Sequence, residues 1–256
     1  MAPMKVYGVQ YDIVWEDQPA NCHKVRAIIA QECPEAGSLV VLPEMFATGF
    51  SNNTTATVAT EATLDTLRSI ARDYHVHVNA GIVVPGENGA RATNRSVVIS
   101  PDGESICEYI KQRPFTLGGE ADAYEAGNEL QILEWQGIKV APFICYDLRF
   151  PELFRPAAAA GAELITVMAS WPDKRVHHWV HLLQSRAIEN QCYVVGVNRI
   201  GKDPNHNHTG RTIIVDYTGA IIADAESDQG TIFTDLDIEA QREYRKGLPF
   251  LADMKR

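Results

Sequence analysis

The sequence lacks a long apolar run. No stretch of about 18 uncharged apolar residues occurs in its 256 residues, and Glu163 interrupts the alanine-rich segment 157–169. The first residues enter a strand pattern directly, without the basic, apolar and small-residue regions of a signal peptide. We therefore expect a cytoplasmic chain without a membrane span, and its 45% apolar content is ample for a packed core.

Cysteine and positive charge are also scarce. The chain has five widely spaced cysteines and no CxxC pair, which favours reduced thiols and excludes the usual structural zinc motifs. A formal net charge of -10 disfavours nucleic acid and anionic membranes as partners, because both need a basic surface. A small anionic ligand is still allowed, since it needs only one or two local cations.

Two motifs of hydrolases and metalloenzymes are absent or incomplete. No GxSxG occurs, which argues against the serine elbow of α/β-hydrolases. His177 and His181 lie four apart on a predicted helix, and His206 and His208 alternate in a loop, but no acidic third ligand follows a known zinc pattern. We expect these histidines to lie on a helix face or pack, and we expect no metal.

Apolar periodicity predicts alternating strands and helices. Strands are expected at 5–9, 39–42, 76–84, 96–100, 105–110, 131–135, 139–144, 164–169, 193–197, 212–215 and 220–223. Helices are expected at 18–32, 63–74 and 176–190. No linker or repeat divides this α/β pattern, so we expect a single domain over 1–256, with the segment from about residue 236 as a candidate for packing on a partner subunit.

Three polar residues each follow a predicted strand. Glu44 follows LVVLP, Lys111 follows SICEYI, and Cys145 follows KVAPFI. Alone, each is more typical of a loop charge, a surface lysine or an inert buried thiol. Strand ends in α/β sheets gather catalytic groups, and a carboxylate, an ammonium and a thiol together form a complete set for acyl transfer.

The segments around these residues resemble a known family. LPEMFATGF, YIKQRPF and ICYDLRFPELF are similar to the three signatures of the nitrilase, or carbon-nitrogen hydrolase, superfamily, and RAIENQCYVVGVNRIG resembles its helix and strand after the nucleophile. The resemblance implies Glu44 as general base, Lys111 as the cation near the oxyanion and Cys145 as nucleophile. It also implies a four-layer αββα sandwich, no cofactor, a small amide substrate, and a homodimer or higher homo-oligomer.

Further site residues follow from the same motifs. The resemblance implies Glu120 as a second active-site carboxylate, with Asp122 as a rival because Gly118 and Gly119 depart from the family pattern. The turn that begins at Cys145 should expose the sulfur and offer the Tyr146 amide as an oxyanion donor, before a helix that starts with Pro151.

Asp147 and Arg149 are expected to hold this turn by hydrogen bonds rather than to contact substrate.

The segment ASWPDKRVHHWVHLLQSRAIENQ resembles the bacterial omega-amidases. That resemblance implies deamidation of 2-oxoglutaramate and 2-oxosuccinamate. Other amides, N-carbamoyl compounds, nitriles and a non-catalytic interaction role remain open alternatives.

Such a substrate carries an anionic end, for which Arg175 is our candidate contact. Phe46, Phe115 and Trp171 are candidates for the pocket wall, although a surface arginine and core aromatics are the alternatives. Arg211 and Thr212 depart from the subgroup pattern and leave the chemistry of that loop open.

Overall fold

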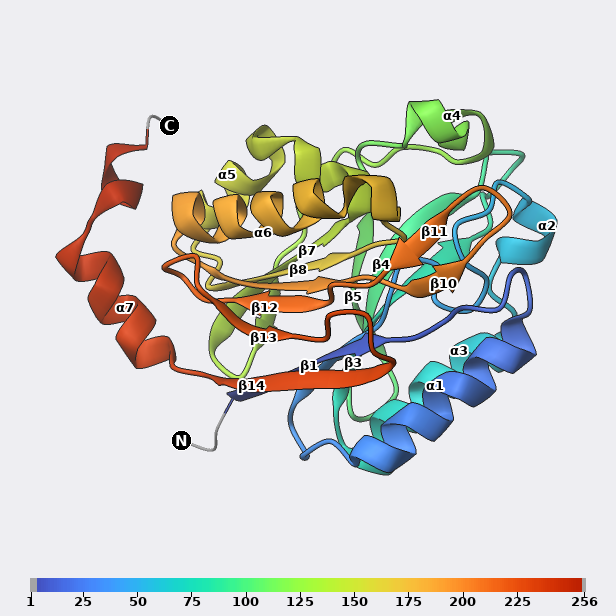
Figure 1. The fold of residues 1–256 in the computed structure, drawn as a ribbon, viewed down its shortest axis with the longest axis horizontal. Helices are drawn as coiled ribbons and strands as arrows, with labels where there is room; N and C mark the ends of the chain where they lie inside the picture. The colour runs from blue at the N-terminus through green and yellow to red at the C-terminus, as the bar shows by residue number, and fades with distance from the viewer. Residues whose placement is uncertain (1–3, 255–256) are drawn as a thin grey trace.

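The computed structural model describes residues 4–254 and consists of two six-stranded sheets packed face to face between helices (Figure 1). Helices α1 (Gln18–Glu32) and α3 (Glu61–Tyr74) cover the first sheet, and α5 (Pro151–Ala159) and α6 (Val176–Asn190) cover the second. These layers confirm the expected αββα sandwich. No helix within residues 4–254 is both long and apolar enough to span a membrane.

The first sheet has the order β14-β1-β2-β3-β4-β5. Its strands are β1 (Met4–Gln10), β2 (Leu39–Val41), β3 (His77–Val84), β4 (Thr93–Ile99), β5 (Ser105–Ile110) and β14 (Gly230–Leu236). Strands β1, β2 and β3 are parallel, and two antiparallel steps through β4 bring β5 into the same direction. The carboxyl ends of β2 and β5, which precede Glu44 and Lys111, therefore lie at the same edge.

The second sheet has the order β13-β12-β9-β8-β7-β6. Its strands are β6 (Leu133–Trp135), β7 (Ile138–Ile144), β8 (Leu164–Met168), β9 (Tyr193–Val197), β12 (Ile213–Val215) and β13 (Ile221–Asp224). Strands β7, β8 and β9 are parallel, so the residues after them, Cys145, Ala169 and Asn198, share one edge. All residues of β8 and β9 are buried, as expected for parallel strands covered on both faces.

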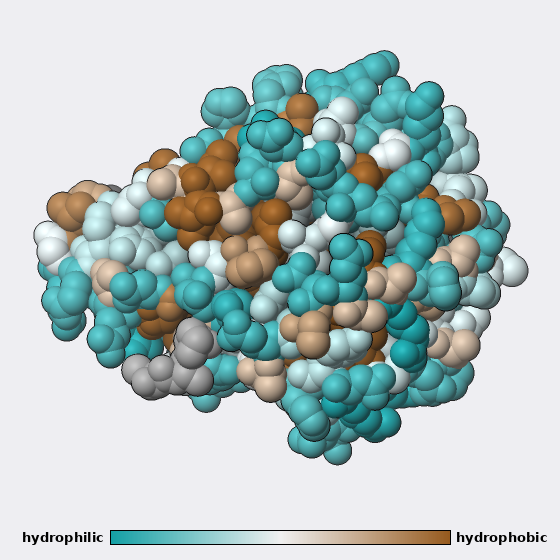
Figure 2. Space-filling model, turned by 60° about the horizontal axis from the view of Figure 1, so that its bottom comes forward, coloured by the Kyte–Doolittle hydropathy of each residue, from teal (hydrophilic) through white to brown (hydrophobic). Residues whose placement is uncertain are grey.

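Smaller elements complete the chain. They are α2 (Thr54–Thr57), α4 (Glu120–Ala123), β10 (Ile200–Lys202), β11 (Asn207–Thr209), α7 (Ile238–Gly247) and the short 3-10 helices η1 (Thr116–Gly118), η2 (Cys145–Arg149), η3 (Asp173–Arg175) and η4 (Phe250–Asp253). Helix α7 follows β14 and lies against the end of the second sheet (Figure 1), where Gln241 donates to the carbonyls of Glu163 and Gln191. Apolar surface is visible beside this helix (Figure 2), and Leu248 and Phe250 after α7 are exposed.

A close approach between β3 and the turn that carries Glu44 fixes the position of that turn. Gly81 on β3 lies so near that turn that a Cβ there would come within 2.6 Å of the Glu44 Cα. The Phe46 amide donates to the Gly81 carbonyl at 3.0 Å, and the Gly81 amide donates to the Pro43 carbonyl at 3.3 Å. The turn after β2 is thus attached to β3 by backbone hydrogen bonds, which only a residue without a side chain permits.

Candidate active site

Three charged side chains meet in the interior between the two sheets. The Lys111 Nζ lies 2.8 Å from a carboxylate oxygen of Glu44 and 2.8 Å from one of Glu120, and we call these three residues the charge cluster. All three are buried, with at most 2% of each side chain exposed. Because buried charges are costly unless they are paired, such a cluster indicates a site rather than a stabilising device.

Neutral donors complete the hydrogen bonding of the charge cluster. Asn94 on β4 donates from Nδ2 to Glu44 at 2.9 Å and to Glu120 at 3.0 Å. The backbone amide of Ser170, which follows β8 in the second sheet, donates to the other Glu44 oxygen at 2.9 Å. Glu44 is therefore held from both sheets, and its orientation does not depend on Lys111 alone.

The local backbone explains why Glu120 points inward. Gly119 has φ of 72°, a left-handed conformation that turns the chain between η1 and α4. The Phe115 amide then donates to Glu120 Oε2 at 2.5 Å. Asp122, the rival carboxylate, is exposed on α4, so the charge cluster contains Glu120 and not Asp122.

Cys145 lies next to the charge cluster at the end of β7. Its φ is 47°, a left-handed value that is unusual for a residue with a side chain and typical of a strained turn at a functional site. Burial raises the pKa of the thiol well above its ordinary value, and the charge of Glu44 raises it further against the opposing effect of Lys111. The resting group is therefore a neutral thiol beside a carboxylate, not a preformed thiolate.

The pKa of Lys111 follows from the same arrangement. Burial alone would lower it, but the carboxylates of Glu120 and Glu44 outweigh burial and raise the pKa of Lys111 well above its usual range. Lys111 is therefore a permanent cation next to the thiol.

Asp147 holds the turn that carries Cys145. Its carboxyl accepts from the Ile144 amide at 3.1 Å, the Arg113 amide at 2.9 Å and the Tyr109 hydroxyl at 2.8 Å. These bonds join the nucleophile turn to the chain just after Lys111. Burial raises the pKa of Asp147 to about 7, against the opposing effects of Lys111 and of these three donors.

A cavity of about 700 Å³ opens in front of Cys145. Its polar lining consists of Ser51, Asn52, Asn53, Ser170, Asp203, Asn205 and His206. Its aromatic lining consists of Trp15, Phe50, Phe115, Tyr146 and Trp171. Arg149 and Arg175 also line it, and we call these two residues the arginine wall. The thiol is thus the member of the reactive set that faces open space, while the charge cluster lies behind it.

The arginine wall carries charge that no carboxylate neutralises in the described part of the chain. Within residues 4–254, neither Arg149 nor Arg175 forms an ion pair. The Arg149 guanidinium lies 4.7 Å from the Trp171 ring centre, and the Arg175 guanidinium lies 5.8 Å from that of Phe115. Burial lowers the pKa of Arg149, and the nearby charge of Arg175 lowers it further.

The structure places the other predicted residues as follows. Phe115 and Trp171 line the cavity, whereas Phe46 is fully buried in the core between the first sheet and its helices and does not contact the cavity. Arg149, which we expected to hold the nucleophile turn, faces the cavity instead, because its side chain extends over the Trp171 ring. Asp147 alone makes the hydrogen bonds expected of that pair.

Arg211 and the helical histidines lie outside the cavity lining. Arg211 pairs with Asp224 on β13 at 2.7 Å, and its carbonyl accepts from the Trp179 indole at 2.7 Å. His177 and His181 are exposed on α6. Among residues 4–254 no group of histidine, cysteine or acidic side chains has the arrangement of a metal site.

Sequence patterns missed three contributors to this site. Asn94 is a polar residue within a strand, which is itself a weak signal because asparagine is depleted there. Ser170 acts through its backbone amide, and Asp203 lines the cavity from a loop distant in sequence. Neither the Ser170 amide nor Asp203 could be recognised as part of the site from its residue type.

Comparison with known proteins gives one consistent answer. Residues 6–246 match the family model described as carbon-nitrogen hydrolase. The chain is 36% identical to the omega-amidase YafV of Yersinia enterocolitica, over 99% of this chain and 97% of the relative. It is 32% identical to the 2-oxoglutaramate amidase of Bacillus subtilis, over 97% and 96% of the two chains.

A solved structure agrees over the whole chain. A CN-hydrolase superfamily protein from Xanthomonas campestris, solved with an arsenic adduct in its active site, superimposes with a TM-score of 0.92 at 30% identity, covering 100% of this chain and 98% of that one. The expected family is therefore confirmed. The chain belongs to the carbon-nitrogen hydrolases of the nitrilase superfamily, the cysteine-nucleophile family, and is an amidase acting on amide bonds other than peptide bonds.

Proposed function

We propose that the protein is an omega-amidase that hydrolyses the carboxamide of 2-oxoglutaramate, or of 2-oxosuccinamate, to the 2-oxo dicarboxylate and ammonia. The observation that carries this proposal is the arrangement of the cavity, with a thiol beside the charge cluster and two unpaired guanidinium groups in its lining. A substrate with an amide at one end and a carboxylate at the other is complementary to both. Full-length similarity to a protein named as an omega-amidase and to one named as a 2-oxoglutaramate amidase supports it.

In the proposed acylation step, Glu44 accepts the proton of the Cys145 thiol as the sulfur attacks the amide carbon. The raised pKa of the thiol means that the proton must move during attack, which requires a carboxylate in contact with it. The tetrahedral oxyanion is stabilised by Lys111 and by the Tyr146 amide, which lies in the first turn of η2 where amide groups lack helical partners. Glu44 then returns the proton to the leaving nitrogen and ammonia departs.

In the proposed deacylation step, water attacks the thioester and Glu44 accepts its proton. Glu120 contributes by holding Lys111 and Asn94, both of which also contact Glu44. The thiol re-forms when the tetrahedral intermediate collapses, and the product leaves as an acid. These steps require no cofactor.

The carboxylate of the substrate is proposed to bind the arginine wall. Arg175 can present two parallel N–H groups to a carboxylate, and Arg149 adds a second cation beside it. Phe115 and Trp171, which carry the two guanidinium groups on their ring faces, then form the apolar sides of the cavity.

A substrate panel tests this proposal. Ammonia release is measured from 2-oxoglutaramate, glutamine, an N-carbamoyl amino acid and a simple nitrile, with the wild type and with Arg175→Ala. We expect 2-oxoglutaramate to react fastest, and Arg175→Ala to raise KM for it about 10-fold to 100-fold, because a charged hydrogen-bond pair contributes about 1.5–3 kcal/mol. An uncharged amide such as propionamide is the control and should show little change in KM.

Preference for the nitrile or the carbamoyl compound would overturn the omega-amidase proposal. An equal rise in KM for charged and uncharged amides in Arg175→Ala would remove Arg175 from the carboxylate contact.

A further inference from the structure

The loop at the tip of the β10–β11 hairpin forms one side of the cavity. Asp203, Asn205 and His206 of this loop line the cavity together with Trp171 and Arg175. The hairpin itself lies outside both large sheets and forms its own two-stranded sheet. Its position relative to Trp171 therefore sets part of the shape of the cavity.

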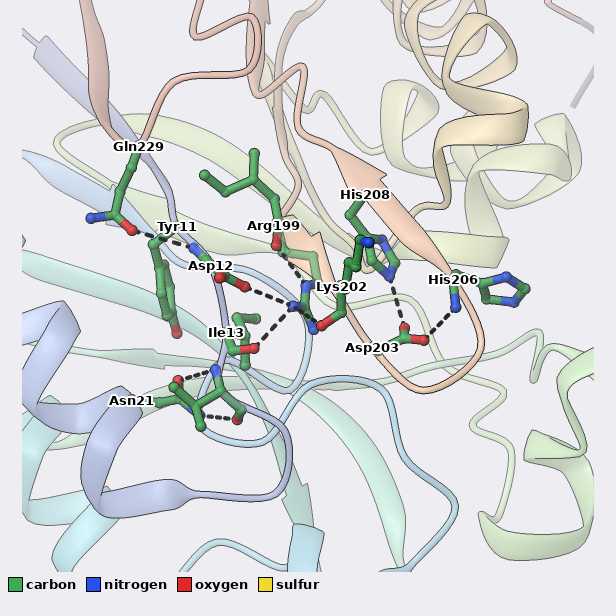
Figure 3. Close-up of polar contacts among 12 residues, drawn as sticks. Tyr11, Asp12, Ile13, Asn21, Arg199, Lys202, Asp203, His206, His208 and Gln229 are labelled. Atoms are coloured by element: carbon green, nitrogen blue, oxygen red, sulfur yellow. Dashed lines mark hydrogen bonds and ion pairs between the residues drawn. The ribbon is translucent and has the colours of Figure 1, made fainter.

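The base of the hairpin is fixed by a buried arginine (Figure 3). Arg199 is fully buried and donates from Nη2 to the carbonyls of Ile13 at 2.9 Å and Lys202 at 3.1 Å, and to Asp12 at 3.3 Å. Gly201 has φ of 88°, and a Cβ there would lie 1.9 Å from the Asp12 carboxylate. The strands of the hairpin are thus anchored to the chain after β1 without help from the tip.

The tip is held by a different pair, Asp203 and His208. His208 Nε2 lies 2.8 Å from Asp203 Oδ2 (Figure 3). His208 Nδ1 lies 3.1 Å from the Trp171 carbonyl. The other Asp203 oxygen accepts from the amides of Asn205 at 2.7 Å and His206 at 2.6 Å. Both side chains are nearly inaccessible, with 1% of His208 and 5% of Asp203 exposed.

This geometry requires an additional proton. The Trp171 carbonyl can only accept, so Nδ1 must carry a hydrogen, and Nε2 faces a carboxylate oxygen. A neutral ring would then place a lone pair against that oxygen at 2.8 Å. Burial opposes ionisation of Asp203, but the bonds from His208, Asn205 and His206 outweigh it and lower the pKa of that carboxyl to about 2. The proton therefore lies on the ring, and the pair is an imidazolium and a carboxylate.

We propose that Asp203 and His208 are positioning residues for substrate binding, which hold the hairpin tip against the Trp171 loop and so keep the cavity in its binding shape. The inference rests on the proposed function only in taking the cavity in front of Cys145 as the substrate site. The pair touches neither Cys145 nor the charge cluster, so its loss should affect binding and leave the chemical step intact.

Other charged groups surround the pair. They are Arg199 and Asp12 at the base of the hairpin, Lys202 and His206 on the hairpin, and Asp173, Lys174 and Arg175 on η3, which contacts β11. Because these groups also act on anionic ligands, the test compares variants with one another under the same conditions.

The test measures kcat and KM for wild type, Asp203→Asn, Asp203→Ala and His208→Ala, with the amide that reacts fastest in the substrate panel. Asp203→Asn keeps the oxygen that accepts from Asn205 and His206, and its amide nitrogen can donate to the lone pair of a neutral His208. It therefore restores both hydrogen bonds of the ring without the extra proton, and the pair stays neutral overall.

We expect His208→Ala to raise KM about 10-fold with kcat within about 3-fold of wild type. Asp203→Asn, which keeps the hydrogen bonds of the pair, should stay within about 3-fold of the wild-type KM, whereas Asp203→Ala, which loses them, should raise KM as His208→Ala does. His23→Ala, which removes an exposed histidine on α1, is the matched control and should behave as wild type.

Two results would overturn the proposal. One is a KM for His208→Ala within twofold of wild type, or a loss confined to kcat. The other is an Asp203→Asn variant whose KM rises as much as that of Asp203→Ala. If His208→Ala does not fold, the comparison of Asp203→Asn with Asp203→Ala still decides. Failure of 2-oxoglutaramate in the panel would instead refute the proposed substrate and leave this test intact with another amide.

Discussion

The charge cluster and the arginine wall lie on the two sides of Cys145, and they differ in whether their charges are paired. In the charge cluster, every ionised group has an opposite partner within 3.0 Å and is shielded from water. In the arginine wall, two cations line the same cavity and neither forms an ion pair among residues 4–254. The comparison suggests two different roles. The paired charges are positioned to take part in the reaction, and the unpaired cations are available to bind an anionic group.

The largest expected effect tests the reactive side directly. Cys145→Ala should lower kcat by at least about 10⁴-fold, because no other group in the cavity can form the thioester. Ammonia release measures this, with Cys33→Ser as the control since Cys33 is exposed on the far end of α1. Activity within about tenfold of wild type, roughly 1.4 kcal/mol of barrier, would end the covalent scheme.

The second-largest expected effect distinguishes the charge cluster from the arginine wall by the stability of the protein as well as by its rate. Lys111→Met leaves two buried carboxylates without their cation, so the free energy of unfolding should fall by about 3–5 kcal/mol and kcat by about 10²-fold or more. Arg149→Gln, on the arginine wall, should change the free energy of unfolding by less than about 1 kcal/mol. Denaturant unfolding measures both, and equal losses in the two variants would remove the distinction.

The smallest effect concerns Asp147, the buried carboxyl behind Cys145. Burial raises its pKa from 3.8 in the unfolded chain to about 7 in the fold, so the folded state binds this proton more tightly. Its contribution to stability is therefore full below about pH 4 and is lost as the pH rises to about 7, with at most about 4 kcal/mol involved. Between about pH 4 and about pH 7, the free energy of unfolding of the wild type should fall relative to that of Asp147→Asn. Above about pH 7, the difference between the two free energies should stay constant. A difference that is constant with pH would contradict the raised pKa.

Sequence patterns predicted most of the sandwich because its strands are apolar and its helices have regular spacing. They missed β14 and α7 for the opposite reason. Only Leu236 of β14 is buried, and only Ile238 and Gln241 of α7 are buried, so neither element has enough buried apolar residues to be recognised from the sequence. The expected packing of the segment from about residue 236 on a partner subunit stays a prediction.

Sequence patterns predicted the reactive residues of the site better than the residues that hold them or line the cavity. Glu44, Lys111 and Cys145 each follow a strand, so topology alone brings them to one edge, and the structure places Glu120 with them. Asn94, Arg149 and Asp203 act through contacts with residues 26 to 50 positions away or through a cavity that exists only after folding. No spacing rule within one sequence encodes such contacts.

Gly81 shows how far the requirements of the site extend into the sheet. Its hydrogen lies where any larger group would meet the Glu44 backbone at 2.6 Å and the Met45 amide nitrogen at 2.8 Å. A methyl group there would push the acid away from the lysine and the thiol while leaving every catalytic side chain in the sequence. An inactive relative could therefore keep all the family signatures intact and owe its inactivity to a single extra carbon in the middle of a strand.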